Sequence, residues 1–99
     1  MLNENSAHVG VYRVLDEVLN GTAVPPGAKG AMFAIIDQLR STAVPLDHVR
    51  RAEQISVEIH KLESALRGSD KSAALIARTE LRTLAAAWIE QRVFERHQN

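Results

Sequence analysis

The stretch from Lys71 to His97 constrains the fold most, because it predicts a long helix that no single neighbour could cover. It contains no glycine, proline or cysteine. One apolar stripe recurs at the spacing of a helical face, and it consists of Ala74, Ala77, Leu81, Leu84, Ala85 and Trp88. Apolar residues also lie on two further sides of this helix. One side carries Leu75, Ile89 and Val93, and the other carries Ile76, Ala87 and Phe94. We therefore expect this stretch to be the central helix of a small all-α protein.

A first, shorter helix is predicted near the beginning of the chain. Residues 1–5 are polar and are expected to be frayed. Ser6 is a candidate N-cap, and the apolar stripe that follows it ends before Asn20 and Gly21, which favour helix termination. These signals predict a helix from Ala7 to Leu19.

A loop and a second helix follow. The segment from Thr22 to Gly30 contains two adjacent prolines and two glycines, so it is predicted to be the longest loop. The next stretch, from Ala31 to Ser41, carries one apolar face formed by Met32, Ile35, Ile36 and Leu39. We expect a helix there that ends before Pro45, since the residue preceding a proline avoids helical geometry.

The third predicted helix begins near Pro45 and runs to Arg67, with Gly68 closing it. Its apolar seam consists of Ala52, Ile55, Ile59, Leu62 and Leu66. Ser69 or Asp70 is the expected N-cap of the next helix, and so short a connection forces an antiparallel hairpin. The predicted fold is all-α, a small four-helix protein with a long antiparallel hairpin formed by the third and fourth helices and two shorter N-terminal helices.

Composition limits the possible functions. The chain has 99 residues, so we expect a single helical domain spanning 1–99. Lysine and arginine number 12, as do aspartate and glutamate, which argues against the clustered positive charge of nucleic-acid or membrane binders. The absence of cysteine excludes a disulfide framework, a thiolate metal site and a cysteine nucleophile. No secretion signal is visible and the longest apolar run, from Leu84 to Ile89, is too short to span a bilayer, so we expect a cytoplasmic protein.

The histidines do not form a metal-binding pattern. His48 has no suitably spaced ligand after it, and His60 has only Glu63, so we predict no metal site, no cofactor and no catalytic group. His48 is expected to be a hydrogen-bonded residue at the edge of the core, and His60 to be exposed. An exposed histidine in mid-helix resembles histidine-phosphotransfer domains, although Glu63 and Ser64 stand where those domains have lysine and glycine. A phosphotransfer module that uses His60 is therefore one alternative, and a small helical nucleic-acid-binding protein is another.

A more specific resemblance lies in the third predicted helix, over residues 56–66. The matching positions are Ser56, Glu58, His60, Ser64, Ala65 and Leu66, with conservative replacements at Val57 and Ile59. This run resembles a helical stretch of TraM-type quorum-sensing antiactivators. The resemblance implies a small, cytoplasmic, all-helical dimer that binds a LuxR-type transcription activator and prevents it from acting on DNA.

Taken together, these features predict a non-enzymatic regulator that binds another protein through an apolar helical surface. The residues expected to mediate partner binding or dimerisation lie outside the main stripes, and they are Val57, Leu75, Ile76, Ile89, Val93 and Phe94. The last two turns of the fourth helix extend beyond the shorter third helix, so either the first two helices or a second copy of the chain must cover them and the other apolar sides, and we expect a homodimer.

Overall fold

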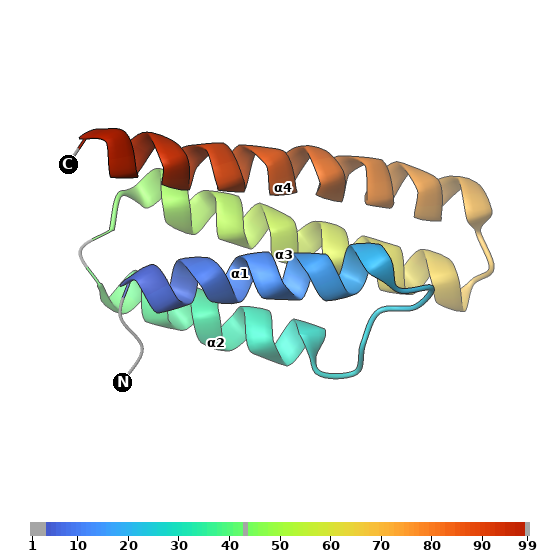
Figure 1. Ribbon diagram of the computed structural model, residues 1–99. Coiled ribbons are helices and arrows are strands. Elements are labelled where there is room, and N and C mark those ends of the chain that lie inside the picture. Colours follow the sequence, from blue (N-terminus) through green and yellow to red (C-terminus); the bar gives the residue numbers. More distant parts are fainter. Residues whose placement is uncertain (1–3, 43, 99) are drawn as a thin grey trace.

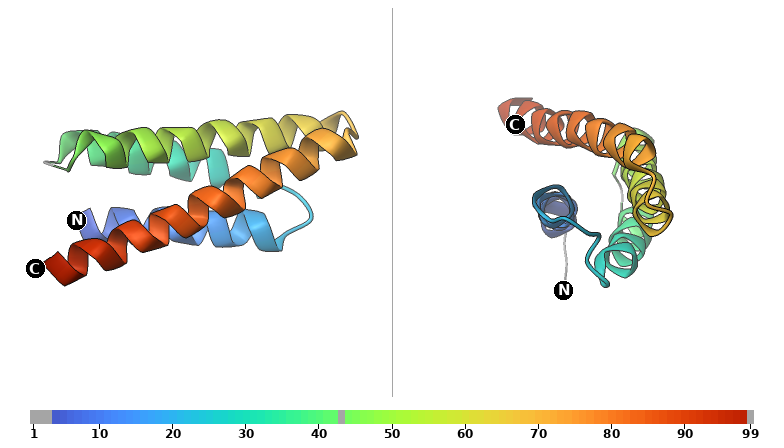
Figure 2. Two further views of the ribbon diagram at one scale, coloured as in Figure 1. Left: turned by 90° about the horizontal axis from the view of Figure 1, so that it is seen from above. Right: turned by 90° about the vertical axis from the view of Figure 1, so that its right-hand side faces the viewer.

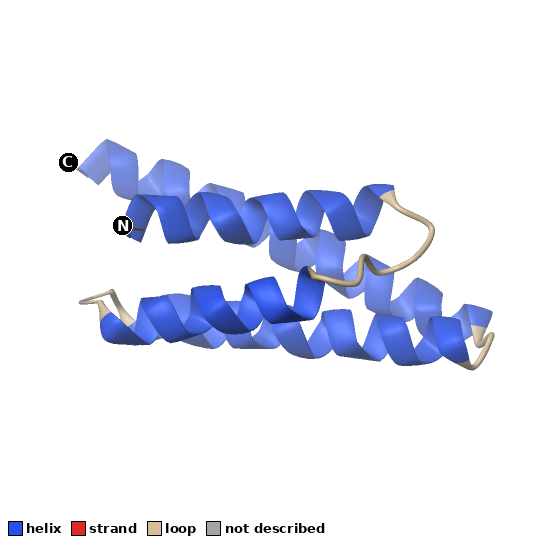
Figure 3. Cartoon of the chain, turned by 90° about the horizontal axis from the view of Figure 1, so that it is seen from below, coloured by secondary structure: helices blue, strands red, loops and turns tan. Residues whose placement is uncertain are grey.

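The computed structural model describes residues 4–42 and 44–98, and the side chains of residues 7–42 and 44–89. It contains four α-helices in the order α1 (Glu4–Asn20), α2 (Ala28–Ser41), α3 (Leu46–Arg67) and α4 (Lys71–Gln98). No strand occurs among these described residues (Figure 3). The all-α prediction is therefore confirmed.

The helices run up and down, and short connections join them (Figure 1). The antiparallel pair of α3 and α4 has the most extensive contact, as predicted, and α1 packs against α2 and α4. Figure 2 shows α2, α3 and α4 as a curved layer, with α1 on its concave side. The resulting bundle is elongated, with dimensions of 45 × 24 × 20 Å.

Two helix starts differ from the predictions. α1 begins at Glu4 and not at Ala7, so Ser6 lies within the helix and is not its N-cap. α2 begins at Ala28, three residues before the predicted start, and includes Gly30. The physical reason is that Ala28 is buried in the core, so packing extends the helix through the exposed glycine.

α3 ends at Arg67 with Gly68 as its C-cap, as predicted, and Ser69 makes the turn toward α4. Ser69 has a φ of 55°, which is the left-handed conformation that helix ends require. The N–H of Asp70 then donates to the carbonyl oxygen of Ala65 at 2.9 Å, as in a Schellman motif. The Asp70 carboxylate accepts a hydrogen bond of 3.0 Å from the N–H of Ala73, so the N-cap role falls to Asp70.

The predicted apolar stripes form one core. On α4, Leu81 and Trp88 are almost completely buried, while Ala85 is half-buried. The prediction that this helix is central is wrong, because in the described part of the chain α4 packs mainly against two helices, α3 and α1. Its remaining sides face solvent, with Leu75 and Ile76 exposed. In a bundle of this kind each helix has two close neighbours, which leaves an outward face on every helix.

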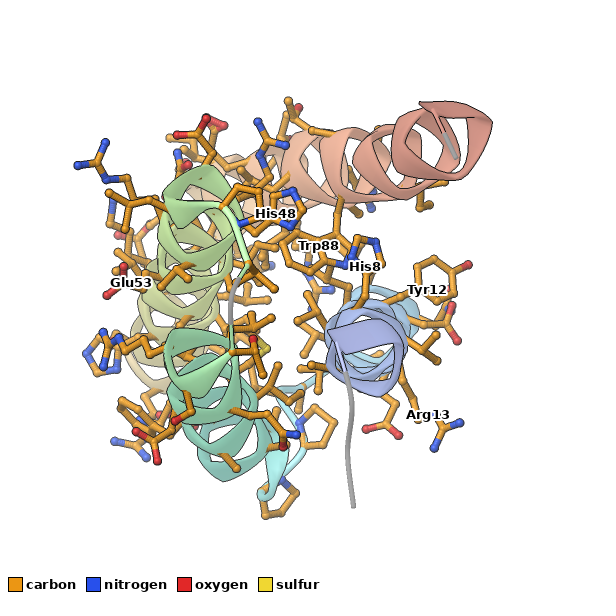
Figure 4. The ribbon with its side chains drawn as sticks, turned by 90° about the vertical axis from the view of Figure 1, so that its left-hand side faces the viewer. His8, Tyr12, Arg13, His48, Glu53 and Trp88 are labelled. Atoms are coloured by element: carbon orange, nitrogen blue, oxygen red, sulfur yellow. The ribbon has the colours of Figure 1, made fainter. Side chains whose placement is uncertain are left out.

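Trp88 fills the end of the bundle where α4 diverges from α3 and approaches α1 (Figure 2). Its ring stacks on that of His8, with centroids 4.5 Å apart, and meets the ring of His48 edge-on at 6.5 Å. The indole Nε1 donates a hydrogen bond of 3.0 Å to the carbonyl oxygen of His8. Figure 4 shows the three rings between their helices. His48 is thus buried in this cluster, further inside the protein than the edge position that we predicted.

The opposite half of α4 is tied to the loop that follows α1. The guanidinium of Arg78 donates to the carbonyl oxygens of Gly21 and Thr22, at 3.1 and 3.3 Å. These carbonyls follow the end of α1 and would otherwise need water as a partner. Arg78 therefore fixes the start of the α1–α2 loop against α4.

Candidate protein-binding surfaces

Four of the six residues predicted to mediate association have described side chains, and all four are exposed in the single chain. Val57 is 53% exposed, Leu75 61%, Ile76 67% and Ile89 44%. Neither α1 nor α2 covers them. Val93 and Phe94 lie outside the residues whose side chains the structure describes.

The three exposed residues of α4 do not form one patch. Leu75 lies over a hollow near the α3–α4 turn, beside Leu66 and Arg78. Ile76 lines a separate hollow that it shares with Ser64 of α3. Ile89 is fourteen residues beyond Leu75, and this spacing returns to the same side of the helix. We call Leu75, Ile76 and Ile89 the α4 outer surface.

A larger depression lies between α2 and α3, on the outside of the bundle. This α2–α3 groove has a volume of about 850 Å³. The residues that line it are Lys29, Phe33, Ala34, Ile36, Asp37, Arg40, Glu53, Ser56, Val57 and His60. The groove brings predicted Val57 and His60 together with Phe33, which sequence analysis missed.

Phe33 is 67% exposed, although its side chain is large and apolar. It lies outside the stripe that faces the core from α2, between buried Met32 and buried Ile35. The signal that could have identified it was an aromatic residue on the polar side of a short amphipathic helix. A single such residue is common on protein surfaces, which is why the sequence alone gave it no weight.

Charged residues close both ends of the α2–α3 groove. At one end the Lys29 ammonium lies 2.8 Å from a carboxylate oxygen of Glu63, and Arg67 contacts the same oxygen at 3.5 Å. The hydrogen bond from Lys29 is the main reason that the pKa of Glu63 is lowered, and the positive charge of Arg67 adds to this effect. At the other end Arg40 forms an ion pair with Glu53.

His60 is exposed, as predicted, and its Nδ1 lies 3.4 Å from the Lys29 ammonium. An ammonium group can only donate a hydrogen bond, so Nδ1 can take part in one with Lys29 only as the acceptor. Lys29 thus supplies a cation next to one of the two ring nitrogens of the histidine. The contact favours a role for His60 in the rim of the groove.

Neither a metal-binding cluster nor a membrane-spanning helix occurs in the part of the chain that the structure describes. There, no three histidine, aspartate or glutamate side chains come together as a metal ion would require. Within the same residues, no helix combines the length and the apolar character needed to cross a lipid bilayer. No family model, no curated protein and no solved structure matches the chain. Function must therefore be argued from the surfaces themselves.

Proposed function

We propose that this protein is a non-enzymatic regulator that binds another protein through the α4 outer surface. The observation that supports this proposal is the exposure of Leu75, Ile76 and Ile89 on a helix whose main apolar stripe, which includes Leu81 and Trp88, is buried in the core. Large apolar side chains on a surface gain free energy when a partner removes them from water. A protein partner can cover several of them at once.

The spacing of these residues suits a helical partner. Leu75 and Ile89 are fourteen residues apart, which corresponds to about 21 Å along one side of α4. Between them, the hydroxyl of Thr79 already donates to the carbonyl oxygen of Leu75 at 2.9 Å, so it presents little unsatisfied polarity. A partner helix of about four turns that lies along α4 would contact both apolar residues.

The resemblance of residues 56–66 to quorum-sensing antiactivators defines the first partner to test, a LuxR-type transcription activator. In this form of the proposal, binding sequesters the activator and keeps it from DNA. Such inhibition needs only a stable complex, and no catalytic group on this chain takes part.

Binding of the purified activator, measured by titration calorimetry, tests the proposal. Wild-type protein is expected to bind, and the double variant Leu75→Glu/Ile89→Glu should bind at least about tenfold more weakly, because charge replaces apolar contact at both ends. Phe33→Glu is the matched control, since Phe33 is equally exposed but lies on α2, and it should bind as wild type does.

Two results would contradict the proposal. If the wild-type chain shows no binding to the activator, the proposed partner is wrong. If the double variant binds as tightly as wild type, the α4 outer surface is not the binding site. Circular dichroism spectra should show unchanged helicity in all variants, because the substituted positions are exposed.

A further inference from the structure

A second surface carries a different inference. We propose that two copies of this chain form a two-fold symmetric dimer in which the α2–α3 grooves pack face to face. Phe33 and Val57 lie at the centre of this interface. This interface lies on other helix faces than the α4 outer surface, and it does not depend on the function proposed above.

The first argument is the position of the exposed apolar residues. Phe33 of α2 and Val57 of α3 line the groove from its two sides, and they are 67% and 53% exposed. The neighbouring groove residues Ala34 and Ser56 are small, so they leave room for a side chain from outside. A protruding aromatic ring beside such a hollow is a shape that can fit a copy of itself.

The second argument is the order of charges along α2. Lys29, Phe33 and Asp37 are spaced by four residues and therefore follow one another along one side of the helix. The positive and the negative residue are equally far from the aromatic one. A two-fold axis that passes near Phe33 makes the α2 helices of the two copies antiparallel. Lys29 of each copy then lies opposite Asp37 of the other, so the interface contains two such pairs.

The same order recurs on α3. Glu53, Val57 and Lys61 are also spaced by four residues, again with opposite charges on either side of an apolar centre. Because α2 and α3 are antiparallel, Lys29 lies toward one end of the groove, and Asp37 and Glu53 lie toward the other. Lys61 is outside the groove lining and borders the hollow between α3 and α4. Glu53 of α3 thus adds a carboxylate at the same end of the groove as Asp37 of α2.

Internal ion pairs reduce the charge of each end without cancelling it. At the basic end, Lys29 and Arg67 share the single carboxylate of Glu63, so positive charge remains. At the acidic end Arg40 pairs with Glu53, while no ion pair links Asp37 to another described residue. The basic end therefore complements the acidic end of a second copy.

Charge order also decides between possible occupants. A uniformly acidic or basic segment would meet a like charge at one end of the groove. A second copy meets opposite charges at both ends, and its Phe33 meets an apolar centre. The groove therefore fits another molecule of this chain better than a segment of one charge sign.

Sedimentation equilibrium of the full chain, over about 1 μM to 1 mM, tests this inference. Wild-type protein should pass from monomer to dimer in that range. Phe33→Glu should weaken dimerisation by about 30-fold or more, because an aromatic residue at the centre of an interface contributes a large share of its affinity. Leu75→Glu, a control of similar exposure on α4, should dimerise as wild type does.

A charge exchange tests the two-fold arrangement itself. Asp37→Lys and Lys29→Asp should each be monomeric alone, since each creates two like-charged pairs across the axis. Mixed in equal amounts they should form a heterodimer, because the two pairs again become opposite in sign.

Three results would overturn the inference. The wild-type chain could stay monomeric at all concentrations, which would leave the groove to a different partner. Leu75→Glu could abolish a dimer that Phe33→Glu leaves intact, which would move the interface to α4. The two charge variants could remain monomeric when mixed, although the wild-type chain dimerises.

Discussion

Trp88 and Phe33 are the two large aromatic residues whose surroundings differ most. Trp88 is 1% exposed and bridges α1, α3 and α4 through two histidine rings and a hydrogen bond to the backbone of α1. Phe33 is 67% exposed and lies over an open groove between α2 and α3. The helices around Trp88 need it to fill the space left by their divergence, whereas the helices beside Phe33 pack without it.

This contrast separates residues that maintain the fold from residues that are free to bind. Burial of an aliphatic or phenylalanine side chain stabilises the folded state by about 1.5–3 kcal/mol, because it removes a large apolar area from water. An exposed aromatic residue contributes little to folding, so its free energy of burial remains available for association. The two regions should therefore respond in opposite ways to substitution.

The largest expected effect is at Trp88. Trp88→Ala should lower the free energy of unfolding by about 3–5 kcal/mol, because it leaves a cavity among three helices and removes the donor to the His8 carbonyl oxygen. Urea unfolding monitored by circular dichroism at 222 nm measures the change. A loss below about 1 kcal/mol would mean that the ring is not part of the core.

Phe33→Ala provides the comparison at the other aromatic residue. Because the side chain is mostly exposed, this substitution should change the free energy of unfolding by less than about 0.5 kcal/mol. Unfolding should be measured at a concentration where the chain is monomeric, since dimer formation would add stability through mass action. A loss as large as that of Trp88→Ala would remove the distinction between the two regions.

The fold could be predicted largely from the apolar stripes, because helical spacing specifies which face is buried. The stripe of α4 that includes Leu81 and Trp88 is buried, and the short turn after Arg67 produced the predicted hairpin. Local details were less predictable. Gly68 caps α3 as predicted, but nothing in the sequence indicated that Ser69 after it would adopt the left-handed conformation.

The surfaces could be predicted only in part. Val57, Leu75, Ile76 and Ile89 are exposed, but a sequence does not reveal which exposed residues of different helices lie together. Val57 belongs with Phe33 of α2, and the groove between them exists only because α2 packs against α3. The contact of Lys29 with Glu63 joins residues far apart in the chain for the same reason.

A smaller effect is expected at Arg78, which ties α4 to the α1–α2 loop and so belongs to the fold-maintaining region. Arg78→Met should lower the free energy of unfolding by about 1 kcal/mol, because two backbone carbonyls lose a charged donor. Arg82→Met, at an exposed position one turn further along α4, should change it by less than about 0.5 kcal/mol. Equal effects of the two substitutions in urea unfolding would contradict the role of Arg78.

The smallest effect is expected at the groove rim, and it depends on pH. Lys29 and Arg67 hold the pKa of Glu63 below its ordinary value of 4.5, because they stabilise the charged carboxylate in the folded chain. Its contribution to stability is therefore present above the ordinary pKa and is lost as pH falls through the lowered one. Glu63→Gln should reduce the urea midpoint at pH 7, and the difference from wild type should disappear in more acidic solution.

In the Lys29→Met background the same substitution should have less effect, because the main donor to Glu63 is absent. A difference that persists at a pH low enough to protonate this carboxyl group in both the folded and the unfolded chain would show that Glu63 acts by packing and not by charge. The groove rim would then belong with Trp88 among the residues that maintain the fold.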